Sequence, residues 1–259
     1  ADAAPQWPWP IRIRSLGQFV VERDGEPEKP ARKESRKPLD LLKLLLAFGG
    51  KSVTVAHLCG ELWPEAEGDA ARNSFDNALH RLRKLLGGDR HVQLQSGALM
   101  LDVATCWTDV AALSTCVTQL DASLTEPASD AGLAAVLTLT DRALTLYQGD
   151  FLAGEEGLPD VQQARERIRA RWTRQLGEAG AHLQACGQPA QAAQIYQRVL
   201  EQQPLAEDIY RRLIQCLISM GQPAEAYEAY RRCRQQLSVT LGLRPAPETD
   251  ALVAGLRNL

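Results

Sequence analysis

The sequence has no apolar run long enough to cross a membrane and no cysteine pair at the spacing of a metal site. A membrane-spanning helix needs about 18 or more consecutive apolar residues, and none of the 259 residues lies in such a run. No signal-peptide pattern opens the chain. The six cysteines lack any CxxC motif and fall mostly inside helical patterns, which is typical of small buried residues in a reducing compartment. They are Cys59, Cys106, Cys116, Cys186, Cys216 and Cys233. We therefore expect a cytoplasmic protein that does not bind membranes.

Motifs that carry enzymatic chemistry are also missing. Residues 50–52, GKS, invite comparison with a phosphate-binding loop, but that motif needs glycine where the chain has Leu45. Neither GxSxG nor HExxH occurs. Glu155 and Glu156 fit solvated loop charges better than catalytic carboxylates. The four histidines have no partners at metal-binding spacing: His57, His80, His91 and His182. We expect no enzymatic activity, no cofactor and no metal.

The chain also lacks a strong net charge, which is only −3. The charge is uneven, however. Residues 10–104 hold 15 Lys and Arg against 13 Asp and Glu, and the rest of the chain is acidic. A mildly basic N-terminal part joined to an acidic C-terminal part is compatible with a DNA-binding module that carries a protein-interaction module.

Residues 69–86 carry the clearest functional pattern. At helical periodicity one face is apolar: Ala71, Phe75, Ala78, Leu79, Leu82, Leu85 and Leu86. The other face is polar: Asn73, Asp76, Asn77, His80, Arg81 and Lys84. Asp69 is a reasonable N-cap, and Gly87-Gly88 a reasonable stop. Asn and Arg are well suited to base edges and phosphates. The competing interpretation is an ordinary solvated helix face.

The segments around this helix predict a small domain with both helices and strands. Two or three short strands are predicted from residue 11, followed by a helix over 39–48 and a short helix over 55–63 that Thr54 caps. The helix over 69–86 comes next. A β-hairpin of residues 91–95 and 99–103 then turns at Ser96-Gly97. The helix over 39–48 is nearly all apolar and should be the central core helix. Strands, three helices and a closing hairpin are the elements of a winged helix-turn-helix.

Residues 10–104 resemble the DNA-binding domain of response regulators and of the bacterial antibiotic-regulatory activators. The segments that carry the resemblance are LGQFVVERDG, LDLLKLLLAFGG, ELWP and NSFDNALHRLRKLLG. The resemblance implies that residues 69–86 are a recognition helix that enters the major groove. The turn of the wing, QLQSGAL, departs from the family because it has no Arg or Lys. Only Gln93, Gln95 and Ser96 could contact DNA there.

This arrangement assigns candidate DNA contacts. Base edges are expected to meet Asn73, Asn77 and His80, with Asp76 and Arg81 as further candidates. Phosphates are expected to meet Arg72, Arg83, Lys84, Arg36, Lys37 and the helix start at Thr54, where free amides favour an anion. For Arg83 an ion pair with Asp or Glu is an equally good alternative.

The rest of the chain is predicted to be helical, with one helix beginning at residues 106–109 and others over 131–147 and 161–186. A repeat with a period of 34 then appears, because residues 187–190 and 221–224 are both GQPA. Ala192 and Tyr196 in the first copy align with Ala226 and Tyr230 in the second. This pattern resembles the tetratricopeptide repeat. The small residue lets two helices approach closely, and the aromatic ring fills the space beside it.

About residues 106–259 resemble the bacterial transcriptional activator domain of the antibiotic-regulatory activators. The resemblance rests on RALTLYQGDFLAGEEG, the repeat pair and LSVTLGLRPAPETDALV. It implies a homodimer on double-stranded DNA and a contact with RNA polymerase. The stiff PQWPWP segment also resembles the linker in larger ATP-dependent regulators that carry this pair of domains at their C-terminus.

We therefore predict a mainly α protein with three parts: a linker over 1–9, a winged helix-turn-helix with small antiparallel sheets over 10–104, and a tetratricopeptide-like activator domain over 105–259. The predicted function is sequence-specific DNA binding that regulates transcription, as an activator. The alternative is a protein-interaction scaffold whose winged helix binds protein instead of DNA.

Overall fold

The computed structural model describes residues 9–28, 36–66, 68–125 and 129–254. The chain divides into two compact units, residues 1–114 with 146–169 and residues 115–145 with 170–259. The predicted linker over 1–9 lies almost wholly outside the described residues. The predicted fold class, mainly α with small N-terminal sheets followed by helical repeats, is confirmed. Among the described helices, none has both the length and the apolar composition to span a bilayer.

The first unit contains two small sheets. The four-stranded sheet has the order β3-β2-β1-β7 and the three-stranded sheet the order β4-β6-β5. The strands are β1 Ile11–Arg14, β2 Val20–Arg23, β3 Glu26–Pro27, β4 Val53–Thr54, β5 Val92–Gln95, β6 Ala98–Leu101 and β7 Cys106–Thr108. The hairpin of β5 and β6 turns at Ser96 and Gly97, whose φ angles are 50° and 75°. Both are left-handed, as a tight two-residue hairpin requires, so the predicted hairpin is confirmed.

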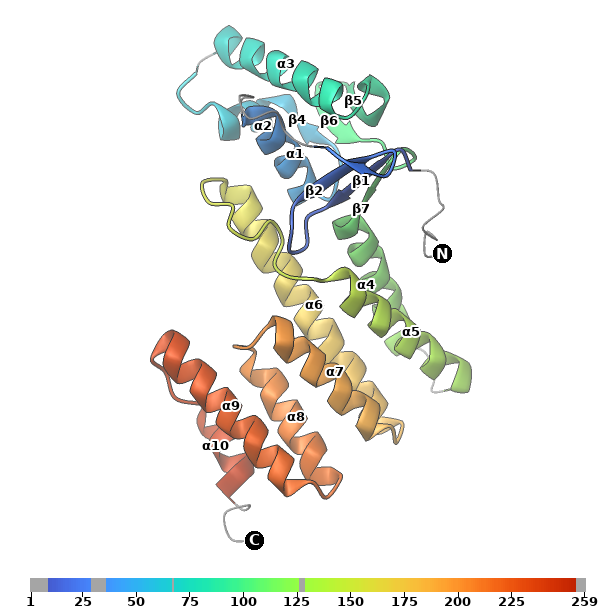
Figure 1. Ribbon diagram of the computed structural model, residues 1–259, viewed down its shortest axis with the longest axis vertical. Coiled ribbons are helices and arrows are strands. Elements are labelled where there is room, and N and C mark those ends of the chain that lie inside the picture. Colours follow the sequence, from blue (N-terminus) through green and yellow to red (C-terminus); the bar gives the residue numbers. More distant parts are fainter. Residues whose placement is uncertain (1–8, 29–35, 67, 126–128, 255–259) are drawn as a thin grey trace. The chain divides into compact units, whose positions relative to one another are not determined.

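Three helices complete the winged helix (Figure 1): α1 Lys37–Ala47, α2 Val55–Leu62 and α3 Gly68–Leu85, with α3 packed against α1 and α2. Helix α1 is the core helix, as predicted, because Leu41, Leu42 and Leu44 are fully buried in it. Gly49 and Gly50 follow its end, adopt left-handed φ angles of 70° and 75°, and bond back to its last turn.

Two boundary predictions need correction, and one strand was not predicted. Residues 106–108 do not begin a helix; they form β7, which pairs in parallel with β1. Helix α4, Asp109–Thr125, begins at the next residue, and Thr108 Oγ1 accepts a hydrogen bond from Ala111 N at 3.2 Å. Helix α3 begins at Gly68, so Asp69 lies in its first turn and is not the N-cap. Strand β4 was not predicted, because a two-residue strand has no periodicity of its own.

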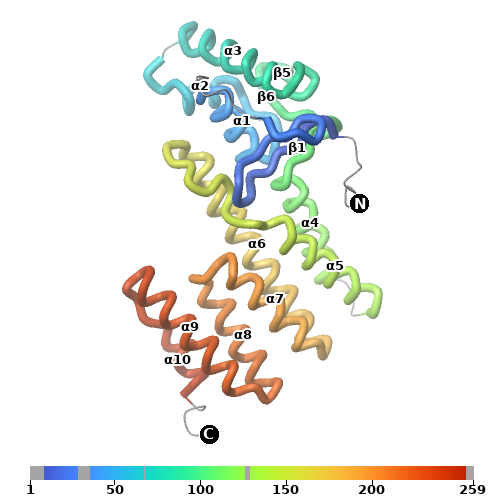
Figure 2. Tube along the Cα trace, in the orientation of Figure 1, coloured from blue at the N-terminus to red at the C-terminus, as the bar shows by residue number. Residues whose placement is uncertain are grey.

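The second unit is all helical. It begins within α4 and includes α5 Asp130–Leu146 up to residue 145 and, from residue 170, most of α6 Pro159–Ala185. Its other helices are α7 Pro189–Gln202, α8 Glu207–Ser219, α9 Pro223–Leu241 and α10 Pro247–Ala254. Helices α7, α8 and α9 lie side by side in chain order (Figure 2). The turns before α7 and α9 have left-handed glycines, Gly187 at 74° and Gly221 at 71°. The two copies of the 34-residue motif therefore make the same turn.

The cysteines fit the predicted buried role in part. Cys106, Cys116, Cys216 and Cys233 are buried, and Cys59 and Cys186 are half-buried. All six are free thiols. Burial raises the pKa of Cys106 to about 11 and that of Cys233 to about 12, so both stay protonated at neutral pH.

Candidate nucleic-acid interface

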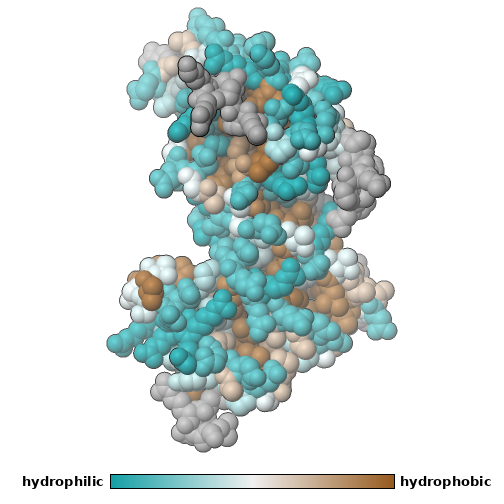
Figure 3. Space-filling model, in the orientation of Figure 1, coloured by the Kyte–Doolittle hydropathy of each residue, from teal (hydrophilic) through white to brown (hydrophobic). Residues whose placement is uncertain are grey.

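Helix α3 has the two faces that its sequence predicts. The apolar side is buried through Ala71, Phe75, Ala78, Leu79 and Leu82. The polar side faces solvent, and no large apolar side chain of α3 is exposed. In the space-filling view the surface over α3, at the top, is mostly hydrophilic (Figure 3). The helix is therefore held by its core face, which leaves the other face for a polar ligand.

Five side chains form an unpaired polar stripe along α3: Asn73, Asn77, His80, Arg81 and Lys84. All five are exposed. Within the part of the chain that the structure describes, none of them makes a hydrogen bond or ion pair through its side chain. Amide, imidazole and guanidinium groups in such a row offer both donors and acceptors to a ligand.

Arg72 and Asp76 occupy the same surface but bind each other. Arg72 Nε lies 3.1 Å from Asp76 Oδ2, and its guanidinium carbon lies 5.5 Å from the centre of the Phe75 ring. Both side chains are about half exposed, at 48% and 50%. Asp76 therefore has its charge balanced within the helix, and Arg72 is held in position.

Arg83 differs from its neighbours. Its Nε and Nη2 donate to the carbonyl oxygen of Val92 at 3.2 and 3.1 Å. Among the described residues Arg83 forms no ion pair with Asp or Glu, the alternative that we considered, and its partner is the backbone of β5. Arg83 thus joins α3 to the first strand of the wing and keeps other N–H groups of its guanidinium for a second partner.

The predicted contacts outside α3 lie at helix termini. Arg36 is exposed and immediately precedes α1. Lys37 Nζ donates to the Leu62 carbonyl at 2.6 Å and lies 5.8 Å from the Trp63 ring centre. Thr54 accepts a hydrogen bond from His57 N at 3.3 Å, which confirms it as the cap of α2.

The wing is short and internally bonded. Gln93 Nε2 donates to Asp102 Oδ2 at 3.3 Å, and Gln95 Nε2 donates to Gln93 Oε1 at 2.9 Å. Gln95 and Ser96 are exposed, whereas Gln93 is half-buried. The turn thus presents an amide, a hydroxyl and backbone groups, without a cation.

A buried carboxylate that the sequence did not reveal connects the first sheet to α4. Asp109 Oδ2 accepts from Ser15 N at 2.6 Å and Leu16 N at 2.8 Å, and Oδ1 accepts from Ser15 Oγ at 2.8 Å. Asp109 is 4% exposed. Burial raises the pKa of this carboxyl, and the hydrogen bonds from Leu16 and Ser15 oppose that effect. Asp109 lies 94 residues from Ser15, so no local pattern could predict the contact.

The segment before α6 is similarly fixed to the winged helix. Glu155, which we expected to be a solvated charge, forms an ion pair with Lys43 Nζ at 2.6 Å. Arg165 donates to three backbone carbonyls, those of Phe151, Leu152 and Glu155. This loop is therefore part of the first unit.

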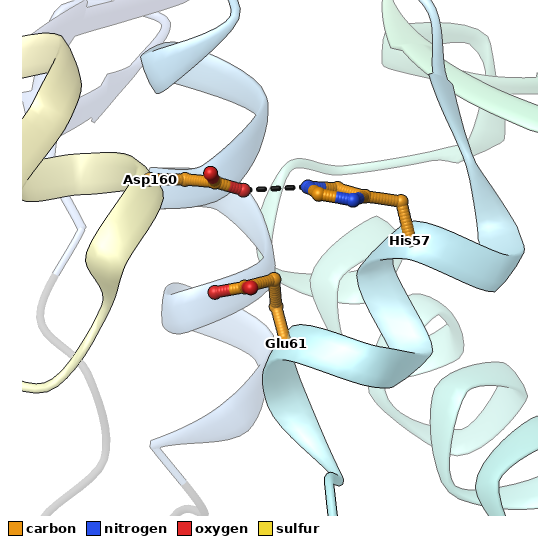
Figure 4. A group of neighbouring side chains, drawn as sticks. All are labelled: His57, Glu61 and Asp160. Atoms are coloured by element: carbon orange, nitrogen blue, oxygen red, sulfur yellow. Dashed lines mark hydrogen bonds and ion pairs between the residues drawn. The ribbon is translucent and has the colours of Figure 1, made fainter.

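The prediction that His57 has no partner at metal-binding spacing is wrong. His57 and Glu61 project from α2 toward Asp160 in the first turn of α6 (Figure 4). His57 Nε2 lies 2.5 Å from Asp160 Oδ2. The spacing of four between His57 and Glu61 was visible in the sequence, but Asp160 is 103 residues away.

The four residues assigned to repeat packing are all buried: Ala192, Tyr196, Ala226 and Tyr230. The Tyr196 hydroxyl donates to Gln184 Oε1 at 2.9 Å, and the Tyr230 hydroxyl donates to Asp250 Oδ1 at 2.8 Å. Burial raises the pKa of Tyr196 to about 12.

A groove of about 530 Å³ lies among α7, α8 and α9. Tyr210, Leu217 and Arg232 are among its lining residues. The buried Tyr210 hydroxyl has no hydrogen-bond partner among the described residues.

Three comparisons relate this chain to known proteins. The family described as the bacterial transcriptional activator domain matches residues 109–257. Regulatory protein AfsR of Streptomyces griseus is 31% identical over 244 residues, which are 93% of this chain and 24% of that protein. The chain thus spans about a quarter of the length of this relative.

A solved structure, Mycobacterium tuberculosis EmbR in complex with a low affinity phosphopeptide, has the same fold at a TM-score of 0.67 and 21% identity. It matches over 96% of this chain and 65% of that one. The match to residues 109–257 covers more than half of the chain and confirms the resemblance stated for its C-terminal part. The chain belongs to the bacterial transcriptional activator domain family of regulators, with a winged helix ahead of that domain.

Proposed function

We propose that the chain is a sequence-specific DNA-binding module that regulates transcription, as an activator. The observation that carries this proposal is the stripe of exposed, unpaired polar side chains on α3. Asn73, Asn77 and His80 would contact base edges, with Arg81 and Asp76 beside them. Asn can pair bidentately with adenine, and a good pair discriminates between bases by about 1–3 kcal/mol.

The phosphate contacts would surround this stripe. Lys84 is the C-terminal member of the stripe, and Arg72 lies beside the stripe on α3. Arg83 is on the same helix, with its guanidinium bonded to β5 of the wing. Arg36, Lys37 and the capped start of α2 at Thr54 would contact the backbone elsewhere. Because the wing has no cation, Gln93, Gln95 and Ser96 would add only weak polar contacts there. We propose residues 10–104 as the DNA-binding domain and 105–259 as the activator domain.

A protein-binding winged helix is the less favourable alternative. Protein interfaces have apolar, aromatic-rich centres, whereas the solvent-facing side of α3 has no exposed large apolar side chain. Three exposed bases, Arg72, Arg81 and Lys84, oppose the single exposed Asp76 among the residues of that side from 72 to 84. A polyanion is therefore the better match in both charge and polarity.

For the helical repeats we propose a role in dimer formation on DNA and in contact with RNA polymerase. Val239, Leu241 and Leu243 are 79%, 51% and 57% exposed near the end of α9. Exposed apolar side chains of this size are candidates for a protein contact. The groove among α7, α8 and α9 offers a second surface for a partner.

The test is selection of bound DNA from a random pool, followed by a salt titration on the selected site. We expect a defined sequence to be enriched. If about five to eight phosphates are contacted, the logarithm of the binding constant should fall with the logarithm of salt concentration with a slope of about −5 to −7. A pool that stays random, or binding that does not respond to salt, would contradict the proposal.

A further inference from the structure

Three potential metal ligands meet within the first unit, away from the exposed face of α3. His57 and Glu61 are four residues apart on α2 and therefore share one face of that helix. Asp160 faces them from the first turn of α6 (Figure 4). One ligand atom from each residue lies within 4.8 Å of the other two.

In the part of the chain that the structure describes, one of the two carboxylates of this cluster has no ion-pair partner. Asp160 forms its ion pair with His57, at 2.5 Å. Glu61 makes no hydrogen bond or ion pair among the residues that the structure describes, and it is half-buried. Two carboxylates therefore share one imidazole. Like charges this close repel each other, and a bound cation would relieve the repulsion.

The ligands are held in place by interactions outside the cluster. The Phe48 ring packs at right angles to the His57 imidazole, with centroids 5.5 Å apart. Thr54 caps the helix that carries His57 and Glu61. Arg165 fixes the loop ahead of α6 through the carbonyls of Phe151, Leu152 and Glu155. Binding would therefore need little ordering of backbone.

We propose that His57, Glu61 and Asp160 bind a zinc ion. One imidazole nitrogen and two carboxylate oxygens match the ligands that Zn²⁺ accepts, at about 2.0–2.2 Å, and a water would complete the tetrahedron. The imidazole makes Mg²⁺ and Ca²⁺ poor candidates, and Mn²⁺ binds such sites more weakly than Zn²⁺ does. The ion would enter between His57 Nε2 and Asp160 Oδ2. Their direct contact would then be replaced by one bond from each atom to the ion.

The bound ion would link α2, the first helix of the helix-turn-helix pair, to the start of α6. Metal that binds the folded state and not the unfolded chain stabilises the fold by mass action. This inference does not depend on DNA binding, and its test needs no DNA.

The test is a calorimetric Zn²⁺ titration of tag-free, chelator-treated protein, together with thermal unfolding with and without Zn²⁺. The parent protein, which carries Cys186→Ser for the reason given below, should bind one equivalent at this site and unfold at a higher temperature with the ion. Glu61→Gln is the decisive variant, because Glu61 has no hydrogen-bond or ion-pair partner to lose among the described residues. It should weaken binding at least ~10-fold, because loss of a group that only supports a metal ligand already costs about 10–100-fold, and it should reduce the thermal shift. The matched control is Glu65→Gln, an exposed carboxylate in the loop after α2, which should bind as wild type does.

The protein has a second possible Zn²⁺ site, which contains a thiol, and the test must exclude it. Cys186 Sγ lies 3.7 Å from His182 Nε2, and such a pair can also take Zn²⁺. All proteins should therefore carry Cys186→Ser. Co²⁺ should then bind without a thiolate charge-transfer band. The proposal would be overturned by a Cys186→Ser protein that shows no saturable Zn²⁺ binding, or by Glu61→Gln binding Zn²⁺ as tightly as Glu65→Gln.

Discussion

Gly180 in α6 lies directly against the Tyr196 ring of α7, and replacing it by alanine should destabilise the repeat domain. A Cβ atom at this position would lie 2.4 Å from Tyr196 Cε1 and 2.5 Å from Cζ. Nonbonded carbon atoms need about 3.5–4.0 Å, so the ring would have to move by more than 1 Å. Tyr196 is fully buried and bonded to Gln184, which leaves the ring little room.

Two effects oppose each other in Gly180→Ala. In the interior of a helix alanine is more favourable than glycine by about 1 kcal/mol. Overpacking a buried contact costs about 1–3 kcal/mol, and loss of the Tyr196–Gln184 hydrogen bond would add about 0.5–1.5 kcal/mol. The steric cost should prevail, with a net loss of about 1–3 kcal/mol in the free energy of unfolding.

The assay is thermal unfolding by calorimetry, which resolves the two units if they melt separately. Gly60→Ala in α2 is the matched control, because a Cβ there meets nothing within 4 Å. Gly60→Ala should raise the free energy of unfolding by up to about 1 kcal/mol. In a Tyr196→Leu background the ring that the new Cβ would meet is absent, so Gly180→Ala should lower the free energy of unfolding much less. If Gly180→Ala stabilises the protein as Gly60→Ala does, the reasoning about this helix contact is refuted.

Three further changes test other parts of the account. Ala226→Leu should cost about 1–3 kcal/mol of stability by overpacking a fully buried position, and an unchanged melting temperature would show that the repeat register is wrong. Asp109→Ala should lower the unfolding free energy by at least ~3 kcal/mol in a urea titration, because it leaves the buried Ser15 and Leu16 donors unpaired; a loss below ~1 kcal/mol would argue against the network. Burial lowers the pKa of His91 below its ordinary 6.5, so the unfolded state binds more protons and stability should fall as pH drops through 6.5. His91→Phe should show a shallower fall than wild type between pH 7.5 and 5.5, and identical slopes would reject this assignment.

Sequence patterns within a short segment predicted α3, the hairpin and the repeat helices. The two faces of α3 follow from residues three and four apart, and the hairpin follows from Ser96-Gly97, which can both adopt left-handed backbone. The helical pairs follow from the 34-residue repeat of glycine, alanine and tyrosine. In each case the signal and the structure span the same few residues.

Contacts between distant segments were not predictable in this way. Strand β7 forms because β1 lies beside it, and its own sequence also suits the start of a helix. Asp109 and Asp160 have partners 94 and 103 residues away. Arg83 could have paired with a carboxylate as easily as with the Val92 carbonyl, and only the position of β5 decides between them. Such choices depend on tertiary packing, which a single sequence does not display.

The central claim is that α3 reads DNA through Asn77 and contacts the phosphate backbone through Lys84. It is tested most directly by the affinities of Asn77→Ala and Lys84→Ala for the selected site and for random DNA, at several salt concentrations. Asn77→Ala should lose about 1–3 kcal/mol on the selected site and almost nothing on random DNA. Lys84→Ala should weaken both alike and reduce the salt slope by about 1. Equal losses for both variants on both DNAs would contradict the account of this face.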